Sequence, residues 1–334
     1  KLTLLTTPRV SGVVEGFSYI DEIIYYDILG ADKGLRGFLR IIKEIKKRDF
    51  DISIDFEHYY NFTAIISRLG GIDNMVGFSV DKQFRRRLFN TKITYDTTQH
   101  EVQTFYEIAK KLGAPNSNVN LEEITTSSED KRIVKQFLEQ NNISDNDLVI
   151  GVHPSTSQSA RVRRWLPKRF AKVIDALQDD FGAKVIITGT SNDKEVINEI
   201  LRGQSLHGNS PRPSHFQQPT TNNQQPGENP IVCTDFSLKE FAEVLRRCNL
   251  FISVDTGPMH MAAAMKTPTI GLFGPNTPKK WRPYGFSGLA IYKDLDCSPC
   301  TKQYLGQISN CKTGECMKEI TTKDVLEVAK EALN

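Results

Sequence analysis

The sequence predicts an α/β fold of two domains, each built on a parallel β-sheet. Short apolar stretches rich in β-branched residues alternate with stretches whose apolar residues recur at helical spacing. This is the pattern of strands joined by crossover helices. A length of 334 residues exceeds what one small core requires and fits two domains. Polar residues follow several apolar stretches, at the strand ends where parallel sheets bind ligands.

Residues 1–115 form the first predicted domain. We expect strands at 2–6, 22–26 and 50–56, and helices at 33–47, 61–69 and 98–112. The last of these helices ends at Gly113, with Pro115 just beyond. The polar and acidic residues 116–147 contain one helical stretch and are interpreted as a connection between domains.

Residues 148–334 form the second predicted domain. We expect strands at 148–152, 183–188, 249–255 and 267–273, and helices at 169–181, 193–201, 236–247 and 258–265. Residues 203–230 are rich in Gln, Asn, Pro and Ser, which predicts a disordered insertion within this domain.

The composition limits the class of protein. A hydrophobic content of 39% and a charged content of 25% are typical of a soluble globular chain. A net charge of +3 does not indicate a nucleic-acid partner. No apolar run approaches the roughly 20 residues of a membrane span, and no secretory signal opens the sequence. We therefore expect a cytoplasmic protein.

Residues 253–260, S-V-D-T-G-P-M-H, place polar residues between a predicted strand and a predicted helix. Asp255, Thr256 and Gly257 occupy the turn, and Pro258 suits the first position of the helix. The start of a helix offers free N–H groups and a positive dipole end, which suit a phosphate. On these residues alone, Asp255 and Thr256 could equally just cap the helix.

Three segments together resemble glycosyltransferase family 9, which contains the ADP-heptose:lipopolysaccharide heptosyltransferases. They are SVDTGPMHMAAAMKTPTIGLFGPNTPKKWRPYG (253–285), GVHPSTSQSARVRRWLPKRFAKV (151–173) and TDFSLKEFAEVLRRCNLFIS (234–253), with weaker echoes in the first domain. The resemblance implies the GT-B fold, in which two Rossmann-like domains with parallel sheets face a central cleft. The first domain would bind the acceptor and the second the nucleotide-sugar donor. It also implies an inverting transfer that requires no metal ion.

The resemblance assigns donor-binding roles to residues at two strand ends. Asp255, Thr256 and Gly257 would hold the diphosphate and the donor sugar, with backbone N–H groups of 256–259 at the phosphates. Ser155 and Thr156 match the hydroxyl pair that the family places beside the donor, although a capped loop would explain them too.

Further donor-side candidates carry alternatives. Arg163 would neutralise the leaving diphosphate, or it belongs to a solvated helix start. The loop at 155–163 is longer than usual in the family, which leaves the register of the neighbouring arginines open. His260 would contact the donor or serve as a packing partner, and Phe236 would line an adenine pocket or belong to the core. Residues 274–277 are expected to form a shaped turn at the cleft.

The general base is expected upstream of residue 1. The resemblance places it on an Asp in a Gly-containing loop after the first strand of the fold, and this sequence starts at what resembles the second strand. Asp55, Glu57 and His58 follow the predicted strand at 50–56 and are weaker substitutes.

Two further features have several interpretations. The basic run 82–89, KQFRRRLF, is a solvated face, or it steers an acidic lipid-linked acceptor or contacts the inner face of a membrane. Cys297, Cys300, Cys311 and Cys316 form C-x2-C-x10-C-x4-C. This spacing fits a structural zinc site, reduced thiols or disulfides.

The leading interpretation is a glycosyltransferase that moves a sugar, expected to be an ADP-linked heptose, to a lipopolysaccharide-type or other glycan acceptor. The alternative is a catalytically silent relative that binds the nucleotide sugar but lacks the base. A metal-dependent transferase would need a D-x-D pair at a strand end, and residues 49–51 and 294–296 are not well placed for one. A nicotinamide enzyme is disfavoured because no G-x-G-x-x-G follows a strand.

Overall fold

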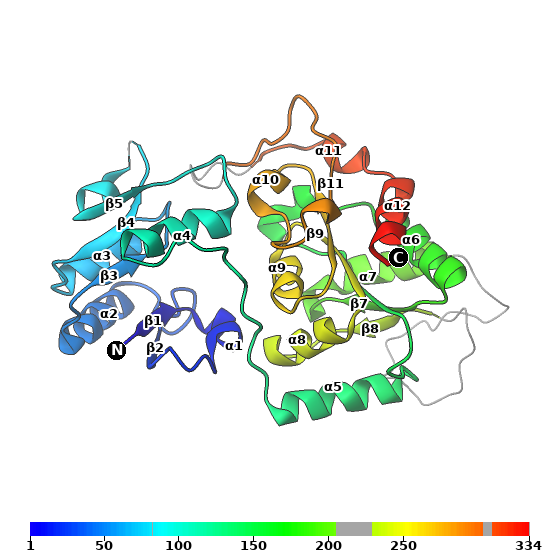
Figure 1. The fold of residues 1–334 in the computed structure, drawn as a ribbon, viewed down its shortest axis with the longest axis horizontal. Helices are drawn as coiled ribbons and strands as arrows, with labels where there is room; N and C mark the ends of the chain where they lie inside the picture. Colours follow the sequence, from blue (N-terminus) through cyan, green and yellow to red (C-terminus); the bar gives the residue numbers. More distant parts are fainter. Residues whose placement is uncertain (82, 205–228, 303–308, 334) are drawn as a thin grey trace. The chain divides into compact units, whose positions relative to one another are not determined.

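The computed structural model describes residues 1–81, 83–204, 229–302 and 309–333, which form two compact units (Figure 1). Unit 1 contains Lys1–Asn120, and unit 2 contains Leu121–Thr301 and Ser309–Asn334. All but the ends of the predicted insertion at 203–230 lies outside the described residues.

Unit 2 is built on a parallel sheet of strand order β11-β10-β9-β6-β7-β8. Its strands are β6 (Val149–His153), β7 (Lys184–Thr188), β8 (Ile231–Cys233), β9 (Leu250–Val254), β10 (Thr269–Phe273) and β11 (Ala290–Tyr292). Every residue of β6, β9 and β10 is buried. Strands covered on both faces carry continuous apolar runs, and this is why the sequence predicted them so readily.

Helices cover both faces of the unit 2 sheet. Alternate residues of β6 point to opposite faces, so Ile150 joins one core cluster and Val149 another. The first cluster receives α6 (Pro167–Phe181), α7 (Lys194–Gly203) and α12 (Thr322–Leu333), and the second α5 (Ser128–Gln140) and α8 (Leu238–Arg247). Helix α5 lies within the expected connection at 116–147, and its Val134 is buried in the second cluster. Residues from 121 onward therefore belong to unit 2.

Unit 1 contains two sets of parallel strands around a common core. β1 (Thr3–Thr6) pairs with β2 (Glu22–Tyr25), and β4 (Met75–Ser79) pairs with both β3 (Ser53–Asp55) and β5 (Thr91–Thr94). The helices are α2 (Leu35–Arg48), α3 (Phe62–Leu69) and α4 (Glu101–Lys111). Ile24 of β2, Ile41 of α2 and Met75 of β4 meet in one cluster. The fold class predicted from the sequence is thus confirmed in both units, but the sequence did not indicate β4 and β5.

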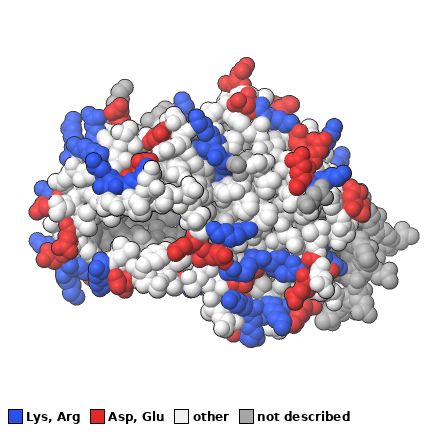
Figure 2. Space-filling model, viewed as in Figure 1, with Lys and Arg blue, Asp and Glu red and all other residues white. Residues whose placement is uncertain are grey.

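Short elements complete the chain. They are α1 (Ser11–Val14), α9 (Gly257–Ala264), α10 (Pro278–Trp281), α11 (Glu315–Lys318), and the 3-10 turns η1 (Pro8–Val10), η2 (Phe84–Arg87), η3 (Gln158–Arg163), η4 (Ser191–Asp193) and η5 (Ser287–Leu289). Basic and acidic side chains are interspersed over the face shown in Figure 2. None of the helices in the described part of the chain is long and apolar enough to cross a membrane.

We predict that Gly151→Ala destabilises unit 2 by about 1–3 kcal/mol, because a Cβ there overpacks the core. It would lie 2.5 Å from the ring of Phe251 and 3.1 Å from Sγ of Cys248. Gly288→Ala is the control, since its Cβ would meet nothing within 4 Å. Chemical denaturation of both variants measures the free energies of unfolding, and equal values would contradict this packing.

The pH dependence of stability is predicted to include His153, at the end of β6. Burial lowers the pKa of this ring from 6.5 to about 4, and Nδ1 lies 3.0 Å from Oγ1 of Thr188. The unfolded chain therefore takes up the proton first as pH falls. The contribution to stability is complete above pH 6.5 and falls by about 2 kcal/mol by pH 5. Denaturation of His153→Gln at pH 7.5 and pH 5 should show a pH dependence smaller by about that amount.

Candidate functional site

The strongest candidate site lies where the strand order of unit 2 reverses. The chain passes from β6 outward to β7 and β8, then returns to place β9 on the other side of β6. His153 and Ser253 are register partners, so the loops after β6 and β9 leave the same edge together. In open α/β sheets, ligands bind at the carboxyl edge next to such a reversal.

Asp255, directly after β9, is the centre of this site. Its side chain is buried, and Nδ2 of Asn276 donates a 2.5 Å hydrogen bond to Oδ2. Nη1 of Arg163 lies 3.3 Å from the same oxygen. Burying a carboxylate is costly unless it is paired, and here an amide and a guanidinium stabilise it together. The structure thus brings together two residues that the sequence nominated separately, Asp255 and Arg163.

The capping alternative for the turn is not what the structure shows. Helix α9 begins at Gly257, and its N-cap Thr256 makes no side-chain capping hydrogen bond. The backbone offers fewer donors than expected from 256–259, because Pro258 has no N–H and the N–H of Met259 donates to the carbonyl of Thr256. Thr256 and Gly257 are therefore the backbone positions best suited to meet an anion.

Ser155 and Thr156 follow β6 and are buried, but their hydroxyl protons are committed. Oγ of Ser155 donates to Oδ1 of Asp193, and Oγ1 of Thr156 donates to the carbonyl of Ala160 at 3.1 Å. Both hydroxyls can therefore offer a ligand only their lone pairs. Such a pair suits a sugar hydroxyl, which can donate, better than a phosphate oxygen, which cannot.

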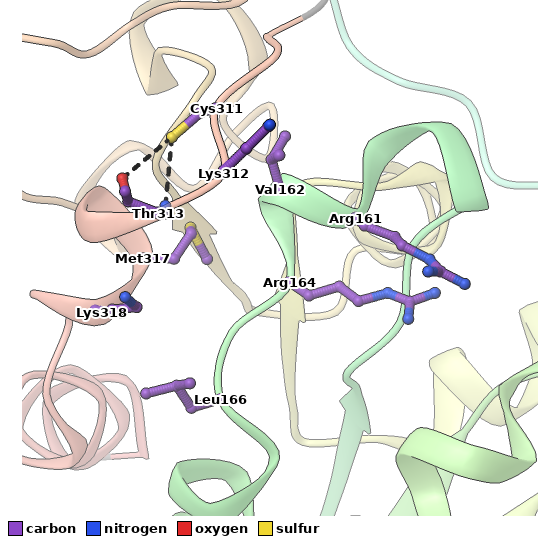
Figure 3. A pocket seen from close by; sticks show the side chains of 10 residues that line it. Arg161, Val162, Arg164, Leu166, Cys311, Lys312, Thr313, Met317 and Lys318 are labelled. Carbon is purple, nitrogen blue, oxygen red and sulfur yellow. Dashed lines mark hydrogen bonds between the residues drawn. The ribbon is translucent and has the colours of Figure 1, made fainter.

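The three arginines near η3 have different surroundings. Arg163 reaches Asp255, whereas Arg164 donates to the backbone carbonyl of Thr156 at 2.9 Å and so holds the loop. Arg161 lines a cavity of about 350 Å³ whose other wall is the 311–318 segment. The guanidinium groups of Arg161 and Arg164 point away from Cys311 (Figure 3).

His260 and Phe236 occupy different surroundings. The ring of His260 is half-buried in α9, 6.4 Å from that of Trp281. Burial lowers its pKa, against the opposing effect of Asp255, so the ring is neutral at pH 7. It can therefore accept or donate a hydrogen bond near Asp255.

Phe236 packs edge-on against Phe137 of α5, with ring centroids 5.1 Å apart. Of the two roles considered for Phe236, this contact corresponds to a place in the hydrophobic core.

Asn276 is the site residue that sequence reasoning missed. It lies in the 274–277 segment after β10, and its side chain is buried against Asp255. A signal was present, since an amide follows the carboxyl end of a strand in this segment. Only the pairing of β10 with β9, which aligns Leu272 with Val254, shows that the two loops meet.

The three substitute bases, Asp55 at the end of β3 and Glu57 and His58 just beyond it, all have structural partners in unit 1. Asp55 forms a 2.9 Å ion pair with the fully buried Arg85 and accepts a hydrogen bond from Thr63. Burial nevertheless raises the pKa of Asp55. Oε1 of Glu57 accepts the N–H groups of His58 and of the next two residues. The ring of His58 stacks on Tyr95 at 4.6 Å.

The basic run at 82–89 is not a uniform charged face. Arg85 is buried beneath it, while Arg86 and Arg87 are exposed, and Lys82 lies outside the described residues. Arg86 pairs with Asp81 at 3.1 Å. The ion pair with Asp55 thus explains why Arg85, in the middle of this basic run, is buried.

The six cysteines are all free thiols. A hydrogen bond with Oγ1 of Thr313 at 3.5 Å, helped by the N–H that Gly314 donates at 3.3 Å, lowers the pKa of the Cys311 thiol (Figure 3). Among the side chains that the structure describes, no cluster of three or more His, Cys, Asp or Glu could hold a metal ion. A zinc site at Cys297, Cys300, Cys311 and Cys316 is therefore not supported.

The sequence of this chain is similar to those of known proteins over most of its length. A profile of glycosyltransferase family 9 (heptosyltransferase) matches residues 38–306. The chain is 22% identical over 340 residues to lipooligosaccharide heptosyltransferase 2 of Campylobacter jejuni, covering 99% of this chain and 94% of that protein. The family match and the pairwise alignment both include residues of unit 1 and of unit 2.

Solved structures show the same fold. The glycosyl transferase family 9 protein from Veillonella parvula superposes with a TM-score of 0.80 at 23% identity, over 99% of this chain and 88% of that one. The Escherichia coli heptosyltransferase WaaC with ADP gives 0.67 at 16% identity, over 98% and 89%. The α/β GT-B fold predicted from the sequence is thus confirmed, and with most of the chain matched by the family profile, this protein belongs to glycosyltransferase family 9, the heptosyltransferase family.

Proposed function

We propose that this protein transfers a sugar, a heptose, from an ADP-linked donor to a glycan acceptor of the lipopolysaccharide type. The observation that carries the proposal is the cluster of Asp255, Asn276 and Arg163 at the strand-order reversal of unit 2. Family membership supports sugar transfer as the reaction class. A structural neighbour with bound ADP supports an adenine nucleotide as the donor.

The chemistry of the cluster suits a nucleotide diphosphate sugar. Arg163 supplies a cation for the leaving diphosphate, while Thr256 and Gly257 offer N–H groups. Asp255 and the hydroxyls of Ser155 and Thr156 present acceptor atoms, which fit the hydroxyls of a sugar. We propose that His260 borders the donor. Phe236 packs on Phe137 in the second core cluster, and we propose that it supports that core and does not line an adenine pocket.

The proposed transfer inverts the anomeric centre and needs no metal ion. In a single displacement the acceptor hydroxyl attacks the anomeric carbon as the bond to the diphosphate breaks, and its proton passes to a base. Arg163 would take the role of balancing charge on the leaving group. Activity that persists with a chelator present is the expected result, and abolition by the chelator would refute metal independence.

A silent binding protein is the second candidate. The observation that favours it is that Asp55, Glu57 and His58 each have structural partners in unit 1, namely Arg85, backbone N–H groups and the ring of Tyr95. Donor binding combined with no transfer to a lipopolysaccharide-type acceptor would select this alternative.

We propose a peripheral acceptor-side contact with the membrane, to which the 82–89 run would contribute through the exposed Arg86 and Arg87.

Asp255→Asn is predicted to weaken binding of ADP-heptose by roughly 10- to 100-fold, because the variant loses the negative charge that holds Arg163 and replaces one buried acceptor oxygen with an N–H donor. Isothermal titration calorimetry with ADP, UDP, GDP and ADP-heptose measures this loss and the base preference together. Asp145→Asn, at an exposed position in the same unit, is the matched control. Wild-type affinity in the Asp255 variant would remove this residue from the donor site.

Arg163→Gln is predicted to separate phosphate binding from base binding. ADP affinity should fall by about tenfold or more, whereas adenosine affinity should change by less than about twofold, because only the diphosphate needs the cation. Arg202→Gln, on the exposed end of α7, removes the same charge elsewhere and should leave both ligands unaffected. Equal losses for ADP and adenosine would mean that Arg163 only supports the fold of the site.

A further inference from the structure

Four cysteines lie close to one another in unit 2. They are Cys297, Cys300, Cys311 and Cys316, and we call them the thiol cluster. Burial raises the pKa of the Cys316 thiol, and the other three thiols raise it further. Because such an effect falls off with distance, the four sulfur atoms occupy a small region. The candidate site does not use this cluster.

Cys300 and Cys311 are the pair that is best placed to meet. Sγ of Cys300 donates to Oγ of Ser309 at 3.1 Å, and the N–H of Cys311 donates to the same oxygen at 3.1 Å. A single hydroxyl group therefore separates the sulfur of Cys300 from the backbone of Cys311. Cys300 is exposed and Cys311 is half-buried, so a small reagent can reach both, whereas Cys316 is buried.

Cys311 has the surroundings of a reactive thiol. The hydrogen bond with Thr313, helped by the N–H of Gly314, lowers its pKa and so raises the fraction present as thiolate. Cys311 also lines the cavity of about 350 Å³, together with Lys312 and Lys318 (Figure 3). The thiolate is the form that attacks a disulfide, so we expect Cys311 to react first.

The thiol cluster is joined to the turn that carries Asn276. The N–H of Cys300 donates to the carbonyl of Pro275 at 3.0 Å, and the N–H of Thr301 donates to the same carbonyl at 2.9 Å. Asn276 follows directly and donates to Asp255 at 2.5 Å. A displacement of Cys300 therefore acts on Asn276 through its neighbour Pro275.

The second half of the cysteine segment packs on the same turn. A Cβ at Gly274 would lie 2.6 Å from Sδ of Met317 and 2.8 Å from Sγ of Cys316, so both sulfur atoms pack against the backbone of this glycine. Oγ of Ser298 donates to the carbonyl of Gly274. The turn is thus held from two directions by the segment that contains the thiols.

We infer that a disulfide between Cys300 and Cys311 forms on oxidation and loosens the turn at 274–276. To bond with Cys311, the sulfur of Cys300 must leave the hydroxyl of Ser309, because disulfide-bonded sulfurs lie about 2 Å apart. This movement draws the backbone N–H of Cys300 away from the turn that it holds. The buried hydrogen bond of Asn276 then weakens. The thiol cluster thus acts as a redox switch on the candidate site.

The reaction is thiol–disulfide exchange with a small-molecule disulfide, for which oxidised glutathione is the probe. The Cys311 thiolate attacks one sulfur of the reagent and releases one glutathione. The Cys300 thiolate then attacks Sγ of Cys311 and releases the second. Two electrons pass from the protein to the reagent, whose disulfide bond breaks as the protein bond forms. The two protons of the protein thiols end on the two glutathione molecules.

Peptide mapping tests the bond. After treatment with oxidised glutathione, trypsin should release peptides 294–302 and 303–312 joined by a disulfide. Cys300→Ser and Cys311→Ser should each abolish this link, whereas Cys297→Ser, which removes the other cysteine of the first peptide, should retain it. Absence of the link, or a link that depends on Cys297, would overturn the inference.

Amide hydrogen exchange tests the coupling without any ligand. Oxidation should raise the exchange rates of peptides that cover 274–281 by about threefold or more, because the turn loses backbone partners. Peptides from β7, separated from β10 by two strands, should be unchanged. The same treatment of Cys300→Ser should leave the turn as in the reduced chain. A cross-linked chain with unchanged exchange at 274–281 would refute the switch.

The consequence for the donor rests on the proposed function. The affinity for ADP should fall by about three- to tenfold on oxidation and recover with dithiothreitol, since Asn276 no longer stabilises Asp255 fully. Equal affinity of both forms would break the link to the candidate site. A reduced chain that does not bind ADP contradicts the proposed function instead, and the mapping and exchange results stand independently of it.

Discussion

The pairing of β6 with β9 is the constraint on which the candidate site of unit 2 depends. It brings together two loops whose residues lie about a hundred positions apart, at 155–164 and 255–257. Gly151 in β6 leaves room for the ring of Phe251, its register partner in β9, because a Cβ there would lie only 2.5 Å from that ring. Packing inside the sheet therefore fixes the relative position of the two loops that carry the candidate site residues. Rigid strands on either side hold Asp255 and Arg163 in place.

Electrostatics explains why the cluster has its particular members. A buried carboxylate beside an anionic diphosphate would repel it, yet Asp255 stands where the donor is proposed to bind. Asn276 compensates the carboxylate without adding charge, and Arg163 compensates it with a cation. A bound diphosphate would share that cation with Asp255. Arg163 therefore links the charge of the ligand to the charge of the protein, and the amide of Asn276 keeps Asp255 stabilised while the arginine is shared.

The features predicted correctly from the sequence are those that depend on neighbouring residues in the chain. Buried strands such as β9 and β10, the turn at Asp255 and most helices follow from apolar periodicity and helix-start residues. The sequence did not indicate Asn276 as a partner of Asp255, since that contact requires the register between strands. The direction of the Ser155 hydrogen bond depends likewise on Asp193, in another loop. Arg85 shows the converse, because a run of charges suggests solvent exposure until a buried acid is found opposite it.

The two units differ in how completely they bury their apolar residues. The candidate site needs fixed acceptors and a fixed cation, and unit 2 supplies them next to fully buried strands covered on both faces. Unit 1 leaves more of its large apolar side chains exposed, among them Leu29, Leu35 and Tyr60. The charged groups of the candidate site thus lie in the unit whose sheet is packed most completely, and this packing keeps their positions fixed.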